Sequence, residues 1–171
     1  MIWRHWSASG ATTSALALAA LGRFGGVEIA SQGATFHRLN SSLCQLAGGQ
    51  SYYLTTFFRP GSSSTGRITI RNAASGDQAT LQGTIGSWSQ SSASAGTLTT
   101  LQNETLHDGT IRLVIRFDAL LTGDYTVGVG PHSTTLGDSI ILLAMQIETG
   151  AASSYIPTQA TPGLRGAESL H

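Results

Sequence analysis

The stretch Leu142–Thr158, LLAMQIETGAASSYIPT, is the part of this chain that decides its fold. It begins within the apolar run Ile140–Ile147, which is typical of a central strand that is buried on both faces or covered by a partner. Gly150 predicts a turn after this strand, and Pro157 ends strand pairing and keeps the chain extended. We therefore expect a central β-strand followed by a tail that packs, through Tyr155, along the edge of a β-sandwich.

Outward from this stretch, the chain from Val27 onward contains short segments in which apolar and polar residues alternate, as in half-buried strands. Four of them predict rows of side chains that point into one shared interior. The rows are Tyr52, Leu54, Thr56 and Phe58 in Ser51–Arg59; Ile68 and Ile70 in Arg67–Arg71; Ile111, Leu113, Ile115 and Phe117 in Thr110–Phe117; and Tyr125, Val127 and Val129.

Weaker strands are predicted between these rows, and polar turns rich in Gly, Ser and Thr separate them. The eight to ten short strands expected in total favour an all-β fold, an antiparallel two-sheet sandwich of jelly-roll type. The weaker strands are Phe36–Leu39, Leu43–Leu46, Gln78–Leu81 and a single strand with long turns within Ser87–Thr100.

The length and composition restrict the class of protein. A chain of 171 residues forms one domain, or one domain with an appendage. Charged residues make up 11% and the formal net charge is zero, so the chain lacks the basic footprint of a protein that binds nucleic acid or an anionic membrane. No apolar run has the length needed to cross a bilayer. Cys44 allows no internal disulfide, and we expect a buried small hydrophobic residue rather than a reactive thiol.

Residues 1–26 need an interpretation of their own. Thr13–Leu21 is rich in alanine and predicts a short helix without a polar face, which we expect to anchor the domain to a sister subunit or a carrier particle. Met1–Trp6 and Ala15–Leu21 also mimic the start and the apolar part of a signal peptide, so cleavage is the alternative. The expected division is an anchor or oligomerisation segment at 1–26, the sandwich at 27–158 and a tail at 159–171.

The closing stretch resembles a signature of phage proteins. Ser154–Thr158, preceded by Gln146 and Glu148, is similar to the sequence aQlE.G..aTSYIPT, which closes a β-sandwich domain of bacteriophage tail fibres and head spikes that phage-like gene transfer particles also carry. Leu164–Leu170 stands where this family often has TRAADSL. Earlier blocks of the family resemble, in the same order, Thr35–Leu39, Leu46–Gly49, Tyr52–Arg59, Asp108–Leu113 and Thr122–Val127.

The resemblance implies a jelly roll like that of carbohydrate-binding modules, in which flat aromatic rings stack on sugars beside planar polar groups. Thr110 and Leu143 stand where the family usually carries aromatic rings, which removes two such platforms. Packing against a neighbouring strand is the alternative for each aromatic residue, and pairing with an acidic residue is the alternative for the arginines. The candidate carbohydrate-binding residues are Tyr53, Phe57, Arg59, Arg112 and Arg116 on strands, and Trp88 in a serine-rich loop region.

Four residues form the structural signature of the closing stretch: Gln146, Glu148, Tyr155 and Pro157. We expect Gln146 and Glu148 to make structural hydrogen bonds, because polar groups buried near the end of a strand need partners. Related carbohydrate modules often hold a structural calcium through carboxylate and carbonyl oxygens. One glutamate does not define such a site, so no metal site and no cofactor is predicted.

No catalytic motif emerges from the chain. Gly137–Ile140 resembles the GDS block of some esterases, but those enzymes carry it near their start and need an Asp-x-x-His near their end. HExxH, zinc-binding Cys/His spacings and glycine-rich phosphate loops are absent from the sequence. The sequence therefore predicts a protein that is not an enzyme.

The expected function is that of a non-enzymatic protein on a virion surface, a head spike or tail fibre of a phage or a gene transfer agent. Its expected partners are host cell-surface polysaccharide, capsid or tail proteins of the same particle, and further copies of itself in a homo-oligomer. Nucleic acid and membrane are not expected partners. Two alternatives stay open: a structural decoration or adaptor domain that binds protein, and a secreted bacterial carbohydrate-binding module.

Overall fold

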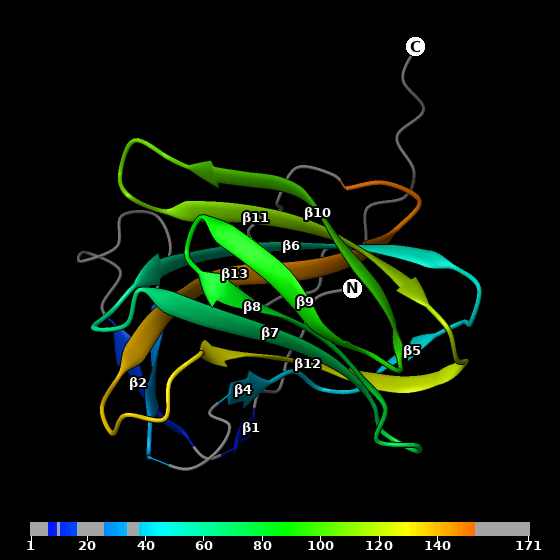
Figure 1. The fold of residues 1–171 in the computed structure, drawn as a ribbon, viewed down its shortest axis with the longest axis horizontal. Coiled ribbons are helices and arrows are strands. Elements are labelled where there is room, and N and C mark those ends of the chain that lie inside the picture. The colour runs from blue at the N-terminus through cyan, green and yellow to red at the C-terminus, as the bar shows by residue number, and fades with distance from the viewer. Residues whose placement is uncertain (1–6, 10, 17–25, 34–37, 153–171) are drawn as a thin grey trace.

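The computed structural model describes residues 7–9, 11–16, 26–33 and 38–152, and every regular element within them is a β-strand (Figure 1). All pairings between these strands are antiparallel, which confirms the expected fold class. The strands are β1 (Ser7–Ser9), β2 (Ala11–Leu16), β3 (Gly26–Ser31), β4 (Arg38–Asn40), β5 (Cys44–Leu46), β6 (Ser51–Pro60), β7 (Thr65–Asn72), β8 (Gln78–Thr84), β9 (Ser87–Ala93), β10 (Gly96–Thr105), β11 (Ile111–Ala119), β12 (Gly123–Pro131) and β13 (Ser139–Thr149).

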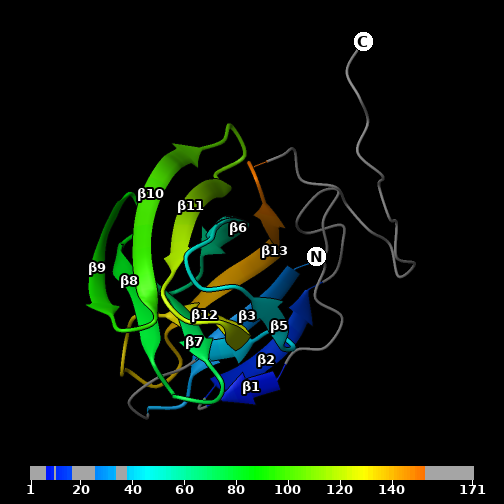
Figure 2. The same cartoon turned by 90° about the vertical axis from the view of Figure 1, so that its right-hand side faces the viewer.

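The strands form two sheets that pack face to face (Figure 2). Sheet A has the order β1-β4-β12-β7-β8-β9, and β5 lies beside β4 on the same edge of β12. Sheet B has the order β10-β11-β6-β13-β3-β2. Ser41 bridges the gap between β4 and β5, because its N–H donates to Val127 O (2.9 Å) and its hydroxyl accepts from Val127 N–H (2.9 Å).

The core lies between the two sheets and contains the four rows predicted from the alternation. Phe117 and Tyr125 pack edge to face across it, with ring centroids 5.8 Å apart. The Tyr125 hydroxyl donates to Leu121 O (2.7 Å), so this buried ring keeps its polar group satisfied. All residues of the rows are buried: Tyr52, Leu54, Thr56, Phe58, Ile68, Ile70, Ile111, Leu113, Ile115, Phe117, Tyr125, Val127 and Val129.

The central strand of sheet B is β13, as the apolar run Ile140–Ile147 predicts. It lies between β6 and β3. Pairing with β6 shifts between Leu142 and Ala144, so Leu143 stands at a bulge. The tail with Tyr155 and Pro157 lies outside the described residues, and so does Phe36 at the start of one predicted strand.

The prediction of a helix over Thr13–Leu21 is wrong in its described part. Ala11–Leu16 forms β2, which pairs with β3 along the edge of sheet B. Alanine is the strongest helix former, but tertiary context overrides helix propensity and a short helix is marginal in water, so strand pairing outweighs it. Residues 17–21 lie outside the described residues, and no helix in the described ranges could span a membrane.

The prediction of one weak strand within Ser87–Thr100 is also wrong. This region contributes β9 to the edge of sheet A and the first half of β10 to the edge of sheet B. The described part of residues 1–26 likewise contributes to both sheets, β1 to sheet A and β2 to sheet B. The division at residue 26 stays a prediction.

Cys44 is buried on β5, as predicted. Burial, followed by the negative charge of Asp124, raises the pKa of its thiol to about 12. The reactive form of cysteine is the thiolate, which is scarce at neutral pH when the pKa is this high. Cys44 therefore acts as a packing residue.

Candidate functional site

The outward side of sheet B brings together five of the six candidate carbohydrate-binding residues. On β6, Tyr53, Phe57 and Arg59 alternate with the buried row and point away from the interior. On β11, Arg116 stands opposite Tyr53 and Arg112 stands opposite Phe57. Each ring therefore has an arginine beside it, at a cross-strand spacing of about 5 Å. We call the surface formed by these five residues the sheet B face.

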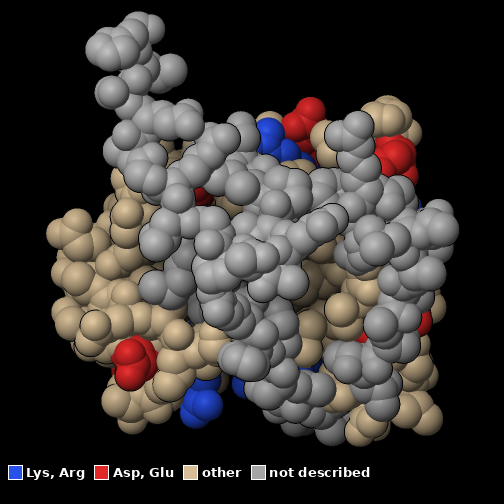
Figure 3. All heavy atoms as spheres, turned by 180° about the vertical axis from the view of Figure 1, so that it is seen from behind, with Lys and Arg blue, Asp and Glu red and all other residues tan. Residues whose placement is uncertain are grey.

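The sheet B face is compact, and its rings are half-buried. Between Tyr53 and Phe57, the outward Thr55 is fully buried, and its neighbour Val114 on β11 is 3% exposed. Gln146 on β13 stands opposite Thr55 and is 5% exposed. Figure 3 views the molecule from the side of sheet B, where basic and acidic side chains lie next to each other at the upper edge.

One end of the sheet B face is held by an ion pair. Arg59 Nη2 donates to Asp108 Oδ2 (2.6 Å), and Arg59 Nε donates to the Thr110 hydroxyl (3.0 Å). The Thr110 N–H and hydroxyl donate in turn to the two oxygens of Asp108 (3.0 and 3.1 Å). Thr110, which stands where the phage family has an aromatic ring, is buried and fixes the position of Arg59.

Replacing Asp108 with asparagine is expected to reduce the loss of stability in acid. The backbone N–H of Thr110, then its hydroxyl, and the Arg59 guanidinium lower the pKa of Asp108 from 3.8 to about 2. A lowered carboxylate pKa gives stability that is fully present above the unfolded value and is lost as the pH falls toward the folded value. Urea unfolding at pH 7, 4 and 2 measures this loss. Equal losses between pH 4 and 2 in the wild type and Asp108→Asn would contradict the assignment.

The two arginines of β11 differ in their partners. Arg116 pairs with Asp118 through Nε and Nη2 (both 3.1 Å), which is one of the acidic partners that the sequence suggested. Arg112 Nε is buried and has no hydrogen-bond partner. A buried donor without a partner is costly, and a ligand acceptor at this position would satisfy it.

Trp88 lies away from the other candidates, on β9 of sheet A rather than in a loop. It points inward and packs edge-on against Phe58, with ring centroids 5.6 Å apart. It stands opposite Gly83 on β8, and a Cβ at Gly66 on β7 would lie 2.7 Å from the Trp88 ring. The indole thus fills space that Gly66 leaves, and it is not part of the sheet B face.

Gln146 and Glu148 lie on β13 beside the sheet B face and share a hydrogen bond, from Gln146 Nε2 to Glu148 Oε2 (3.1 Å). Glu148 stands opposite Tyr53 and extends the row of Arg116 and Tyr53 by an acidic group. Within the described ranges, no three His, Cys, Asp or Glu residues come together as metal ligands would.

The structure adds Glu104 to the rim, a residue that the sequence did not indicate. Glu104 on β10 stands opposite Arg112 and accepts from Gln102 Nε2 (2.8 Å). Asp108-Gly109 is typical of a hairpin turn, which has one strand before it and one after it. The turn therefore indicates β10 as well as β11. Glu104 would then have been placed beside Arg112.

Comparison with known proteins gives the type of fold. No protein-family model and no curated protein sequence matches this chain. Among solved structures, it is similar to the CBM22-1–GH10 modules of an endo-1,4-β-D-xylanase from Clostridium thermocellum in complex with xylohexaose. The TM-score is 0.53 with 12% sequence identity, over 88% of this chain and 27% of that chain.

A second similar structure is a carbohydrate-binding module from Cellvibrio mixtus lichenase 5A in complex with cellotriose, with a TM-score of 0.44 and 13% identity over 88% of this chain and all of that one. This chain spans about a quarter of the length of the xylanase structure, as the 27% coverage shows. At such low identity the likeness shows the fold alone, which is a sandwich of the carbohydrate-binding-module type.

Proposed function

We propose that this chain is a non-enzymatic carbohydrate-binding domain on the surface of a phage or a phage-like gene transfer particle, and that its sheet B face binds host cell-surface polysaccharide. The observation that carries the proposal is the register of β6 and β11, which sets Tyr53 beside Arg116 and Phe57 beside Arg112. The two rings are four residues apart on one strand, about 13 Å, and can contact different sugars of one polymer.

The chemistry of the sheet B face suits a sugar polymer. Rings offer apolar faces to the C–H edges of sugars, while the arginines are planar donors to hydroxyl oxygens. Beside Phe57, Arg112 has a buried Nε donor without a hydrogen-bond partner. Gln146 and Glu148 add amide and carboxylate groups along the adjacent strand.

The particle context rests on the resemblance of Ser154–Thr158 and the earlier sequence blocks to the phage domain. On a particle, many copies act together, and multivalency converts weak contacts of single domains into tight attachment. A homo-oligomer attached to capsid or tail proteins would supply such copies. Electron microscopy of the particle with a labelled chain tests this location.

The binding role is tested with the double variant Tyr53→Ala and Phe57→Ala. The full chain, displayed in many copies on beads, is applied to an array of bacterial surface polysaccharides. We expect binding by the wild type and a loss of at least about tenfold in apparent affinity for the variant, equivalent to 1.4 kcal/mol. Leu136→Ala, at a residue that is 75% exposed in the β12–β13 loop, is the control. Unchanged binding by a folded double variant would rule out the sheet B face.

A second candidate function is that of an adaptor domain whose sheet B face binds another protein. The half-buried rings and the separate position of Trp88 favour it, because the face lacks a third aromatic ring. The same array distinguishes the two functions. An adaptor would bind no polysaccharide at high valency. It would instead bind a protein of the particle, and the Tyr53→Ala and Phe57→Ala double variant would lose that binding.

A further inference from the structure

Sheet A carries a second polar surface on its outward side, on the opposite side of the sandwich from the sheet B face. On β12, between β4 and β7, the positions on the outward side of sheet A are occupied by Gly128 and Gly130. A Cβ at Gly128 would lie 2.6 Å from Arg38 Cδ and 2.7 Å from Asn40 Oδ1. The missing side chain therefore makes room for Arg38 to lie over β12.

Three arginines belong to the strands on either side of β12: Arg38 to β4, and Arg67 and Arg71 to β7. Burial, followed by the charge of Arg71, lowers the pKa of Arg38, and burial, followed by the charge of Arg38, lowers the pKa of Arg67. The Arg38 guanidinium thus interacts unfavourably with both of the other arginines. In the described part of the chain the ion pairs involve Arg59 and Arg116, so Arg38 and Arg71 have no carboxylate partner there.

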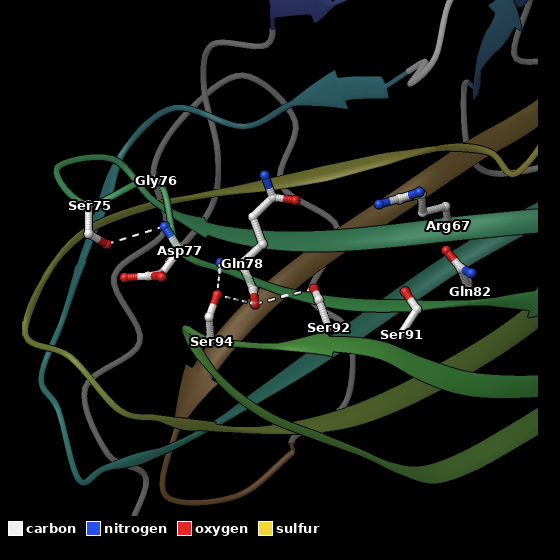
Figure 4. Close-up of a pocket in the computed structure, with 9 residues that line it drawn as sticks. All are labelled: Arg67, Ser75, Gly76, Asp77, Gln78, Gln82, Ser91, Ser92 and Ser94. Carbon is white, nitrogen blue, oxygen red and sulfur yellow. Dashed lines mark hydrogen bonds between the residues drawn. The ribbon is translucent and has the colours of Figure 1, made fainter.

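A depression of about 560 Å³ opens beside Arg67, along β8 and β9 (Figure 4). Its walls are hydroxyl and amide groups, and Arg67 stands at one end. Among the described residues, the side chains of Gln78, Gln82 and Ser91 have no hydrogen-bond partner, so they are available to a ligand. From Gln78 to Gln82 the depression extends over four strand residues, about 13 Å, which is the length of a short oligosaccharide.

The charges select the ligand. No aromatic side chain lines the depression, so a neutral sugar would gain only uncharged hydrogen bonds. A carboxylated sugar gains charge-assisted bonds, which are stronger and can be bidentate to a guanidinium. Asp77 lies at the end opposite Arg67, with its carboxylate directed away from Arg67 in Figure 4, and Asp124 is exposed at the start of β12. A Cβ at Gly76, next to Asp77, would lie 3.3 Å from Arg71 Nη2, so arginine side chains stand near both ends of the depression and outnumber this carboxylate.

We propose that the depression of sheet A, together with the arginines around it, binds an acidic polysaccharide whose sugars carry carboxylates, as uronic acids do. The carboxylates contact Arg38, Arg67 and Arg71, and the sugar hydroxyls contact Gln78 and Gln82. This site is separate from the sheet B face and rests on the proposed function only in the polysaccharide class of its ligand.

Polygalacturonate and the same polymer with its carboxyl groups reduced to alcohols are matched probes for this site. We expect the full chain to bind polygalacturonate at least about tenfold more tightly than the reduced polymer. The double variant Arg38→Gln and Arg71→Gln is expected to lose at least that factor while its melting temperature stays unchanged. Equal binding of both polymers, or full affinity in the folded double variant, would overturn the proposal.

Two tryptophan variants test the same site by steric blocking, without a change of charge. Ser91→Trp fills the depression, whereas Ser87→Trp adds the same ring to the same strand outside it, and both positions are exposed. We expect only Ser91→Trp to weaken polygalacturonate binding, and equal effects of the two would contradict the site. Dextran sulfate tests sulfate as the source of charge, and a DNA duplex tests nucleic acid; a match to polygalacturonate by either one overturns the carboxylate assignment.

Testing the sheet B variant with the sheet A ligand distinguishes the two proposed sites. Tyr53→Ala with Phe57→Ala should leave polygalacturonate binding intact, even if it abolishes array binding through the sheet B face. Loss of polygalacturonate binding in this variant, with retention in Arg38→Gln and Arg71→Gln, would overturn the sheet A site and support the sheet B face. These experiments therefore show which of the two proposals fails, because each site has its own variant.

Discussion

Replacing Phe117 with alanine is expected to lower the free energy of unfolding by about 3–5 kcal/mol. The Phe117 ring is fully buried at the centre of the sandwich, where it packs edge-on against Tyr125. The substitution removes a large apolar surface and leaves a cavity that strands fixed by pairing on both sides cannot close. Urea titration followed by intrinsic fluorescence measures the change.

Leu101→Ala on β10 is the matched control, since this large apolar residue is 49% exposed. Surface substitutions of this kind change stability by about 0.5 kcal/mol or less. A Phe117→Ala variant as stable as the control would mean that the two sheets do not share one core.

The second large effect is expected at Gly96, where substitution by alanine should cost about 2–5 kcal/mol from backbone strain and overpacking combined. Gly96 opens β10 with φ at +153°, and a Cβ there would overlap Asp118 O and lie 2.5 Å from Phe117 Cε2. Neither neighbour can move freely, because one is backbone of β11 and the other is a core ring. Denaturant unfolding again gives the magnitude.

Gly137→Ala separates strain from overlap. Gly137 has φ at +87° and nothing within 4 Å of the Cβ position, so its cost should be that of backbone strain, about 1–2 kcal/mol. Equal costs at Gly96 and Gly137 would show that the overlap relaxes. The Gly96→Ala and Phe117→Ala effects should not add when combined, because removing the ring also removes one of the overlaps.

The inward rows and the outward positions of Tyr53 and Phe57 were predictable because alternation along one strand is a local property. Each residue of β6 and β11 has its side fixed by its neighbours in sequence, so the face that carries both rings follows directly. The position of Trp88 could not be found in this way. It depends on Gly66, which belongs to another strand and makes room for the indole only once sheet A is assembled.

The N-terminal strand and the arginines of sheet A show the same limit. Thr13–Leu21 is rich in alanine, which favours helix, and pairing with β3 makes its described part a strand. Arg38 and Arg71 are distant in sequence and approach each other across β12, so no spacing in the chain indicates them. Non-local pairing determines both features.

The position of β13 at the centre of sheet B has a consequence for synthesis on the ribosome. Thr56 on β6 donates to Ala144 O on β13, a residue 88 positions later in the chain. Strand β3 also pairs with β13. Until β13 emerges, β6 and β3 each present an unpaired edge that can join with another nascent chain. Polysomes that carry many copies of this chain should therefore depend on chaperones, and messages truncated before Ser139 should yield insoluble products.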